Sequence, residues 1–196
     1  MNRIVLDIET QNLFSDVGGK GNLSKLLLSV AGVYSYSDNK FLTFTEKEMP
    51  AFENLLKRTD LIIGFNIDHF DLPVLKKYLS IDLAKIPTLD IMAEFVSVAG
   101  HRVSLDDLVG NTLGKRKSGN GLAAVDYWRQ GRMDELKKYC LDDVRLTKDL
   151  YEHCLKNGEL KYTARDANLP YVKTLKINLA KYSGLEIKKL WTPSLF

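Results

Sequence analysis

The amino-acid sequence predicts an α/β fold: a mixed sheet of about five strands, the first three in a meander, flanked by helices and followed by a short C-terminal extension. Two observations predict it. Three strand-like stretches follow one another near the start, and the later strand-like stretches alternate with helical patterns, an order typical of a mixed sheet covered by helices. The chain of 196 residues is 45% hydrophobic, enough to form a core in one domain.

The first three strands are predicted from apolar runs and turn residues. Residues 3–9 are a short strand, and residues 26–36 and 40–45 are two more. Ser37-Asp38-Asn39 lies between the last two and is typical of a turn, so we expect a hairpin there. A glycine-rich loop, residues 18–21, precedes the hairpin.

Helical and strand patterns then alternate. In chain order they are a helix over residues 46–58, a strand over 60–65, a helix that begins near His69 with Pro73 in its first turn, and a strand over 86–91. The remainder is mainly helical, and its longest helix is predicted from Met133 to Leu155, with Asn157-Gly158 as its stop.

The helical periodicity weakens after Gly158, so we place a boundary near residue 155. Residues 1–155 form the main domain in this prediction, and residues 156–196 form a basic extension in which 160–163 and 174–179 are candidate short strands.

Composition limits the function classes. The chain holds 28 Lys and Arg, 25 Asp and Glu and 3 His, a net charge of +3, and it has no apolar run near the roughly 18 residues that span a bilayer. Cys140 and Cys154 lie on one predicted helix, about 21 Å apart by helical rise, so they cannot pair. We expect a cytoplasmic protein with buried free thiols and no membrane partner.

The charge is unevenly distributed. Residues 1–155 hold 20 basic and 22 acidic side chains, whereas residues 156–196 hold 8 and 3. A second basic excess lies between Gly110 and Arg132. Basic segments beside an acidic body are typical of nucleic-acid contacts, although solvated surface charge is the commoner explanation.

Asp7 and Glu9 are two residues apart on the first predicted strand, so both side chains leave the same face. Charges in an apolar strand need water, a counter-charge or a cation. The alternative is a strand end that faces solvent, and for this pair alone both interpretations stay open.

Asp71 follows the end of the strand over residues 60–65, where sites gather in open sheets. Asp68 or Asp71 equally suits a cap of the next helix, and capping is the simpler explanation for this position alone.

Tyr139 and Asp143 are four residues apart on the long helix and therefore share a face, whereas Asp142 is rotated about 100° away. A Tyr beside an Asp is often only a packing contact. Four carboxylates gathered at one sheet edge would, however, require cations, and all-oxygen ligands suit Mg²⁺ or Mn²⁺. Two such ions can hydrolyse a phosphodiester.

These residues match three motifs of a known family. They are Asp7-Ile8-Glu9-Thr10, Asn66-x-x-x-Phe70-Asp71 and Tyr139-x-x-x-Asp143. In this order and spacing the chain resembles the DEDD 3′-5′ exonucleases of the ribonuclease-H-like superfamily. The tyrosine four residues before the last aspartate resembles the DEDDy branch. Residues 120–147 are similar to predicted exonucleases related to the proofreading domain of family B DNA polymerases.

The resemblance covers about residues 1–155 and implies a ribonuclease-H-like fold with 3′-5′ exonuclease activity. It implies that Asp7, Glu9, Asp71 and Asp143 bind two divalent ions, with Asp7 bridging them, and that Tyr139 orients the attacking water. Relatives of this kind occur alone or with helicases, so a helicase or another DNA-repair protein is a candidate partner.

The resemblance also implies substrate contacts. Thr10 and Leu13 fall where family members touch the terminal nucleotide, and Asn66 falls where the substrate strand or the water network is supported. Gln11-Asn12 departs from the usual Thr-Gly, which affects the expected geometry around Leu13.

The predicted loop over residues 114–121 carries Lys115, Arg116 and Lys117 among glycines. We expect it to grip the substrate backbone near the metal ions, with an ordinary solvated loop as the alternative. The aromatic residues of the extension either stack on unpaired bases, dock on the domain or face a partner, and docking is the favoured interpretation.

Two function classes follow. The first is a metal-dependent 3′-5′ exonuclease, with single-stranded DNA favoured over RNA because of the polymerase-like motifs. The second is a catalytically silent nucleic-acid- or partner-binding module of the same fold, and an endonuclease or RNA-directed enzyme is a variant of the first.

Overall fold

The structure is a computed structural model that describes residues 1–117, 119, 121–165 and 169–182. The main sheet contains β1 (Arg3–Thr10), β2 (Leu28–Ser35), β3 (Lys40–Phe44), β4 (Leu61–Gly64) and β5 (Thr88–Asp90). The α-helices are α1 (Met49–Leu56), α2 (Asp71–Leu75), α3 (Ile91–Ala99), α4 (Leu105–Leu113), α5 (Gly121–Arg129) and α6 (Met133–Asn157). A second sheet pairs β6 (Glu159–Arg165) with β7 (Pro170–Lys176).

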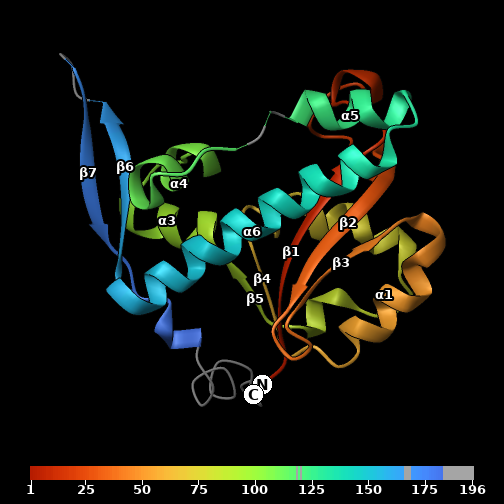
Figure 1. The fold of residues 1–196 in the computed structure, drawn as a ribbon, viewed down its shortest axis with the longest axis horizontal. Helices are drawn as coiled ribbons and strands as arrows, with labels where there is room; N and C mark the ends of the chain where they lie inside the picture. Colours follow the sequence, from red (N-terminus) through yellow and green to blue (C-terminus); the bar gives the residue numbers. More distant parts are fainter. Residues whose placement is uncertain (118, 120, 166–168, 183–196) are drawn as a thin grey trace, which may run out of the picture.

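The main sheet has the strand order β3-β2-β1-β4-β5 (Figure 1). The first three strands pair antiparallel, and β4 and β5 are parallel to β1. The predicted mixed sheet with a three-strand meander is therefore confirmed. The helix-containing connections before β4 and β5 allow parallel pairing, which a short hairpin cannot provide.

The hairpin between β2 and β3 turns where the sequence predicts. Asn39 has a left-handed φ of 51° and accepts a hydrogen bond from the Tyr34 hydroxyl at 2.6 Å. The helix predicted over residues 46–58 is shorter and in two parts, because a capping box of Thr45 and Glu48 begins a 3-10 turn (Glu46–Glu48) and Pro50 lies in the first turn of α1.

Other predicted boundaries shift by a few residues. The helix near His69 begins at Asp71, and the strand over residues 86–91 is reduced to β5. The long helix ends at Asn157, and the next residue, Gly158, has a φ of 65° that suits glycine, as the predicted stop requires. The second candidate strand of the extension starts earlier than predicted, because β7 pairs along the whole of β6.

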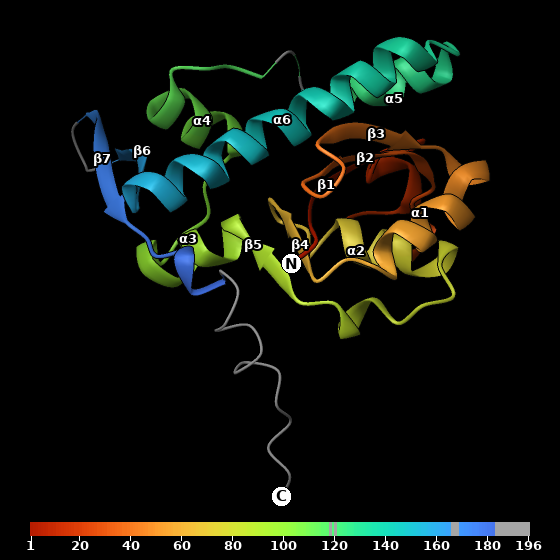
Figure 2. The same cartoon turned by 60° about the horizontal axis from the view of Figure 1, so that its bottom comes forward.

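The two faces of the sheet are covered by different helices (Figures 1 and 2). One face packs against α1 and α2, around Phe52, Ile62 and Val74. The other packs against α6 and α3, around Ile63, Phe95 and Leu150. The sheet is therefore the middle layer, as expected for a sheet whose two faces both need apolar cover.

Helix α6 reaches the sheet closely because of one glycine. Gly32 on β2 pairs with Asp7 on β1, and a Cβ atom at Gly32 would lie 2.7 Å from the Cys140 sulfur of α6. Any side chain at this position would push the helix away from the sheet. Gly32 thus brings the middle of α6 beside Asp7.

The described part of the extension packs on the main domain. Lys161 donates its backbone N–H to Thr112 of α4 at 2.9 Å, and Thr163 donates to Asp107 at 2.8 Å. Tyr162 is buried and stacks edge-on against Phe95, with ring centroids 5.0 Å apart. Tyr162 therefore fills the core between α3 and the second sheet.

Tyr182 of the extension also contacts the domain, through a 2.6 Å hydrogen bond to Glu94, whereas Tyr171 is 43% exposed. Trp191, the remaining aromatic candidate for base stacking, lies outside the described residues. Both cysteines are buried and free, as predicted. Within the described residues, no helix is both long and apolar enough to cross a membrane.

Candidate active site

The site begins with the alternation of β1. Val5, Asp7 and Glu9 leave the face that α6 covers, while the residues between them face α1 and α2. Asp7 and Glu9 are only partly buried, because they lie toward the carboxyl end of the strand. The predicted same-face pair is therefore present, and it faces a helix rather than open solvent.

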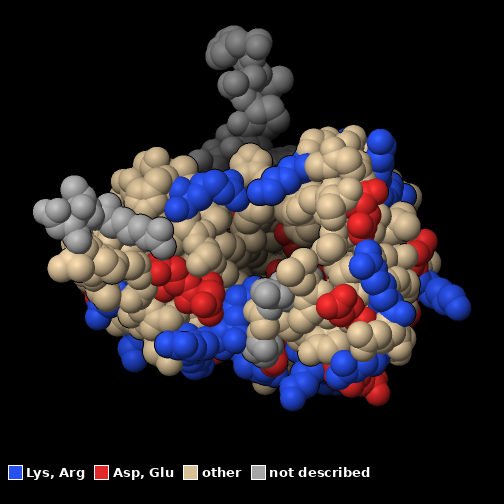
Figure 3. Space-filling view, turned by 90° about the horizontal axis from the view of Figure 1, so that it is seen from above, with Lys and Arg blue, Asp and Glu red and all other residues tan. Residues whose placement is uncertain are grey.

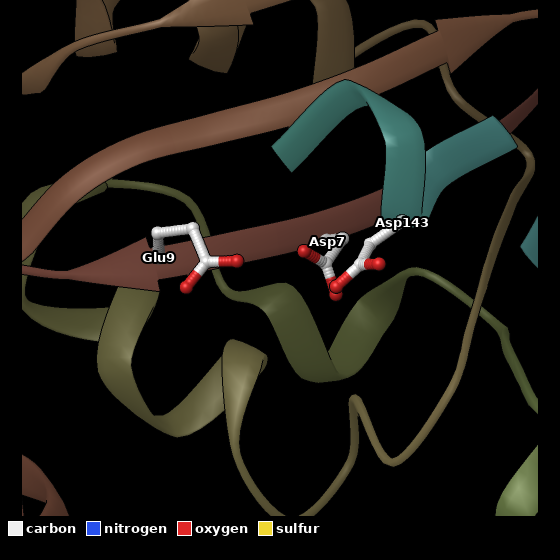
Figure 4. A group of neighbouring side chains, drawn as sticks. All are labelled: Asp7, Glu9 and Asp143. Atoms are coloured by element: carbon white, nitrogen blue, oxygen red, sulfur yellow. The ribbon is translucent and has the colours of Figure 1, made fainter. Parts of the chain in front are cut away.

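Helix α6 adds the third carboxylate. Asp143 is buried, and one ligand atom from each of Asp7, Glu9 and Asp143 lies within 4.8 Å of the others. Figure 4 shows the three side chains pointing toward one another from β1 and α6. Residues separated by 134 positions thus form one acidic cluster, which we call the carboxylate cluster.

The cluster is electrostatically strained. Burial, followed by repulsion from Asp143 and Glu9, raises the pKa of Asp7 well above its usual range. Burial, followed by repulsion from Asp143, does the same to the pKa of Glu9. Carboxylates that repel one another in a site with little access to water need a compensating positive charge.

Lys117 supplies one such charge. Its Nζ lies 2.6 Å from Asp143 Oδ2, and its side chain is only 22% exposed. Burial alone would lower the Lys117 pKa, but the pairing with Asp143 raises it, so the ammonium stays charged. A single charge compensates only part of a three-carboxylate cluster.

Asp71 lies beside the cluster rather than within it. Its Oδ1 accepts the backbone N–H of Ile8 at 3.0 Å, between the two acidic positions of β1. Burial raises the Asp71 pKa to about 7, and its charge in turn contributes to the raised pKa of Asp7. Asp71 is the first residue of α2, so its side chain connects that helix to β1.

A divalent cation fits the oxygen atoms that are present. Asp143 Oδ1 is buried and has no hydrogen-bond partner among the described residues. An unpartnered buried carboxylate oxygen is costly unless a ligand satisfies it. Asp7, Glu9 and Asp143 offer only oxygen atoms, the donor set that Mg²⁺ and Mn²⁺ prefer.

Tyr139 lies one helical turn before Asp143 and is buried, with 4% of its surface exposed. Burial, and then the charges of Asp143 and Glu9, raises the pKa of its hydroxyl above the ordinary range. The hydroxyl is therefore protonated near neutral pH and is a hydrogen-bond donor beside the cluster.

Cys140, predicted from the sequence only as a buried free thiol, is a neighbour of Asp7. Its thiol lies 3.5 Å from the Asp7 carbonyl oxygen and 3.8 Å from Asp7 Oδ2. Burial raises the pKa of this thiol well above its usual range, so it is an uncharged packing partner of Asp7.

The predicted substrate-contacting residues divide into two groups. Thr10 and Leu13 form the first group, at and just after the end of β1. Thr10 is buried and donates its hydroxyl to the Asn12 carbonyl at 2.9 Å. Leu13 donates its backbone N–H to the Asp16 carboxylate. Asn66 instead lines an open pocket of about 490 Å³ that also reaches Asp7 and Lys117.

The basic loop is not used as one unit. Lys117 contacts the cluster, whereas Lys115 pairs with Asp149 at 2.6 Å and Arg116 lines a separate cavity beside Asp106. Ser118 and Asn120 of this predicted loop lie outside the described residues. Of the three basic side chains, Lys117 is the one that contacts the carboxylate cluster, and the expected grip of the loop on the substrate backbone stays a prediction.

Asp90 was missed by sequence reasoning. It is buried at the end of β5, and Oδ1 accepts the backbone N–H groups of Asn66 at 2.7 Å and Met92 at 2.9 Å. An acid between a predicted strand and a helix is a signal for an N-cap, but it does not reveal that the same carboxylate also fixes the loop of Asn66.

The molecule is hollowed at one end (Figure 3). Figure 3 looks onto the end where α5 lies in Figure 1, and it shows a hollow with acidic atoms at its floor and basic side chains around it. This arrangement suits a negatively charged substrate that approaches bound cations.

Comparison with solved structures supports the fold. The chain is similar to a family B DNA polymerase from the hyperthermophilic archaeon Pyrobaculum calidifontis, with a TM-score of 0.59 and 20% sequence identity. The similarity covers 79% of this chain and 24% of the polymerase, so the chain corresponds to about a quarter of that enzyme.

No curated protein matches the chain. The model of the RNase_H superfamily matches residues 4–155, which include the main sheet apart from Arg3, the first residue of β1, and the carboxylate cluster. From this match and the mixed five-stranded sheet, we conclude that the chain belongs to the RNase_H superfamily.

Proposed function

We propose that the protein is a metal-dependent 3′-5′ exonuclease of the DEDDy type that removes nucleoside 5′-monophosphates from single-stranded DNA. The observation that carries the proposal is the carboxylate cluster, in which Asp7, Glu9 and Asp143 converge within 4.8 Å on a superfamily fold. The unpartnered Asp143 Oδ1 supports a cation there.

In this proposal Asp7, Glu9 and Asp143 would hold two divalent ions, with Asp71 beside the cluster. When bound, the ions would neutralise phosphate charge and favour ionisation of a water molecule. The water loses one proton to solvent and its oxygen bonds to phosphorus, while the bond from phosphorus to the 3′ oxygen breaks and that oxygen takes a proton from solvent. Such a reaction depends mainly on positioning and charge compensation.

Tyr139 has the protonation state that its proposed role requires. Its hydroxyl is a donor beside Asp143, so it can hold the attacking water in line. Thr10 and Leu13, at the carboxyl end of β1, are proposed to contact the terminal nucleotide.

The preference for DNA rests on similarity to a DNA polymerase. End-labelled single-stranded DNA, duplex DNA and RNA should be incubated with Mg²⁺ or Mn²⁺ and resolved by length. We expect a ladder that shortens from the 3′ end, fastest on single-stranded DNA. Internal cuts, shortening from the 5′ end, or no metal-dependent cleavage of any strand would refute the proposal.

The basic loop has a separate test. Lys117 is proposed to contact the substrate backbone near the cluster, and Lys115, which pairs with Asp149, is the matched control. Each lost phosphate contact reduces the salt slope of single-strand binding by about 0.7. We expect that reduction for Lys117→Met and not for Lys115→Met, measured with metal present. If wild type and Lys117→Met have equal salt slopes of binding, Lys117 does not contact the substrate backbone.

A second candidate function is a catalytically silent nucleic-acid-binding module. The ion pair of Lys117 with Asp143 favours it, because a built-in cation compensates part of the cluster. The two candidates differ in the cleavage assay, since a silent module binds the strand without shortening it.

A further inference from the structure

The pocket beside the carboxylate cluster has a second wall that the proposed mechanism does not use. This wall comes from the segment between α3 and α4, and it carries Arg102. The pocket has a volume of about 490 Å³ and reaches from Arg102 to Asp7. That volume is in the range of about 300 to 1,000 Å³ found for small-molecule sites, so it has room for one nucleotide.

Arg102 is held by an uncharged partner. Its Nη2 donates a hydrogen bond of 2.6 Å to the side-chain oxygen of Asn66. Within the described part of the chain, Arg102 forms no ion pair, whereas four of the other arginines pair with acids. Examples are Arg58 with Asp38 and Arg129 with Asp16. The guanidinium charge of Arg102 is therefore left for another anion.

Asn66 is itself fixed in place. Its backbone has a left-handed φ of 65°, and its N–H donates to the buried Asp90 carboxylate at 2.7 Å. Asp90 also caps α3, so the loop of Asn66 is attached to the start of that helix. Because one Arg102 donor is committed to this fixed oxygen, its remaining donors have a defined direction.

The rest of the lining suits the other parts of a nucleotide. Phe65, Met92 and Val103 line the same pocket and provide apolar surface for a base or a sugar. A planar guanidinium forms paired hydrogen bonds with phosphate oxygens, and it is less strongly hydrated than an ammonium group. The pocket thus combines a fixed phosphate-binding group with apolar walls.

We propose that Arg102, oriented by Asn66, binds the phosphodiester group next to the one that is cleaved at the carboxylate cluster. Arg102 is a substrate-binding residue in this proposal, and Asn66 acts through it as a positioning residue. The inference rests on the proposed exonuclease function and adds a phosphate subsite to it.

The first test compares cleavage of one short single-stranded DNA by wild type and Arg102→Ala. We expect KM to rise about tenfold, the value of a hydrogen bond to a charged group, with little change in kcat. Arg58→Ala is the matched control, because Arg58 precedes the opposite, amino-terminal end of β4 and is 56% exposed. Thermal unfolding of each variant should match wild type, since Arg102 is exposed.

The second test identifies the phosphate. A neutral methylphosphonate replaces one linkage at a time, starting next to the scissile bond. At the linkage that Arg102 binds, wild type should lose about tenfold in kcat/KM, and Arg102→Ala should lose nothing further. A defect of Arg102→Ala that is the same on every modified strand would overturn the proposal.

Asn66→Gly tests the positioning role without strain, because glycine accepts the left-handed backbone at this position. It should raise KM about threefold alone and add nothing to Arg102→Ala, as expected for residues that act as one unit. Independent, additive effects would remove the role of Asn66.

The outcomes separate the two proposals. If wild type cleaves the strand and Arg102→Ala has an unchanged KM, the phosphate subsite is wrong and the exonuclease proposal stands. If wild type neither binds nor cleaves any strand, both are wrong.

Discussion

The two faces of β1 differ in composition and in role, although they belong to one strand. The residues that face α1 and α2 are all apolar, and they are Ile4, Leu6 and Ile8, each no more than 3% exposed. On the other face, Val5 is apolar but Asp7 and Glu9 lie under α6 with raised pKa values, mainly because of burial. The apolar face stabilises the fold, and the charged face reduces its stability.

The difference shows how the two roles are kept apart. Side chains on a strand alternate between faces, so a charged site on one face leaves the packing of the other unchanged. Helix α6 repeats this separation along its length, since Asp143 faces the cluster and Leu150, two turns later, is packed in the core. Substitutions on the two faces should therefore have separable effects.

The largest expected effect is on catalysis by the charged face. Asp7→Asn and Asp143→Asn should each lower the cleavage rate by about a thousandfold or more, because a lost ligand removes both charge compensation and position. Single-turnover rates with saturating Mn²⁺ measure this.

Asp142→Asn is the matched control, because Asp142 is adjacent on α6 and pairs with Arg145 instead. Its rate should stay within about twofold of wild type, as for most surface changes. Undiminished metal-dependent activity in Asp7→Asn would contradict the assignment of the cluster.

The next effect is on stability, from the apolar face. Leu6→Ala should lower the free energy of unfolding by about 2 to 5 kcal/mol, because it removes buried methyl groups and leaves a cavity. Urea unfolding measures this, and Val98→Ala on exposed α3 surface should change it by about 0.5 kcal/mol or less. If Leu6→Ala abolishes cleavage at a temperature where the variant is still folded, the two faces of β1 do not have separable effects.

The third effect is metal-dependent stability. Mg²⁺ or Mn²⁺ at a hundred times its dissociation constant should stabilise the protein by about 2.7 kcal/mol, which raises Tm by roughly 5 to 10 °C. Differential scanning calorimetry with a chelator as reference checks this.

Asp143→Asn should lose most of the metal-dependent Tm rise. Without metal, Asp7→Asn should be at least as stable as wild type, because it relieves repulsion within the cluster. A metal-free Asp7→Asn that unfolds well below wild type would show that the charged face is not strained.

A smaller effect is expected at Tyr139. Tyr139→Phe should lower kcat about tenfold with little change in KM, the size of one lost hydrogen bond in the transition state. Tyr151 lies further along α6, and its hydroxyl accepts a hydrogen bond from Arg3, so Tyr151→Phe should leave the rate unchanged. Equal rates for wild type and Tyr139→Phe would remove the water-orienting role.

The smallest expected effect is a change of metal-free stability with pH. Burial raises the Asp71 pKa to about 7, above its unfolded value of about 4, so the folded state binds the extra proton between these pH values. Metal-free stability should therefore fall as pH rises from about 4 to about 7. Asp71→Asn keeps the Oδ1 acceptor for Ile8 and should flatten this fall, measured by urea unfolding across the range. Parallel pH profiles would contradict the buried, proton-binding state of Asp71.

Much of the fold follows from local patterns in the sequence. Turn residues between β2 and β3, the apolar run of β4 and the glycine stop after α6 each act on a few neighbouring residues, so they can be recognised without long-range information. Boundaries such as the split before α1 are less predictable, because a cap and a proline compete within the same few residues.

From the sequence, the candidate site can be predicted only as two separate pairs of residues. A strand period of two brings Asp7 and Glu9 to one face, and a helix period near 3.6 aligns Tyr139 with Asp143. These relations are properties of the local backbone. The sequence by itself therefore determined the Asp7–Glu9 pair, the Tyr139–Asp143 pair, the elements that carry them and the mixed sheet.

Only the tertiary structure decided how the pairs meet. Gly32 allows α6 to approach Asp7, Lys117 rather than Lys115 or Arg116 reaches the cluster, and Asp90 fixes Asn66 beneath Arg102. Each of these depends on contacts between segments far apart in the chain. Periodicity carries no information about such contacts, because they are set by the packing of whole layers.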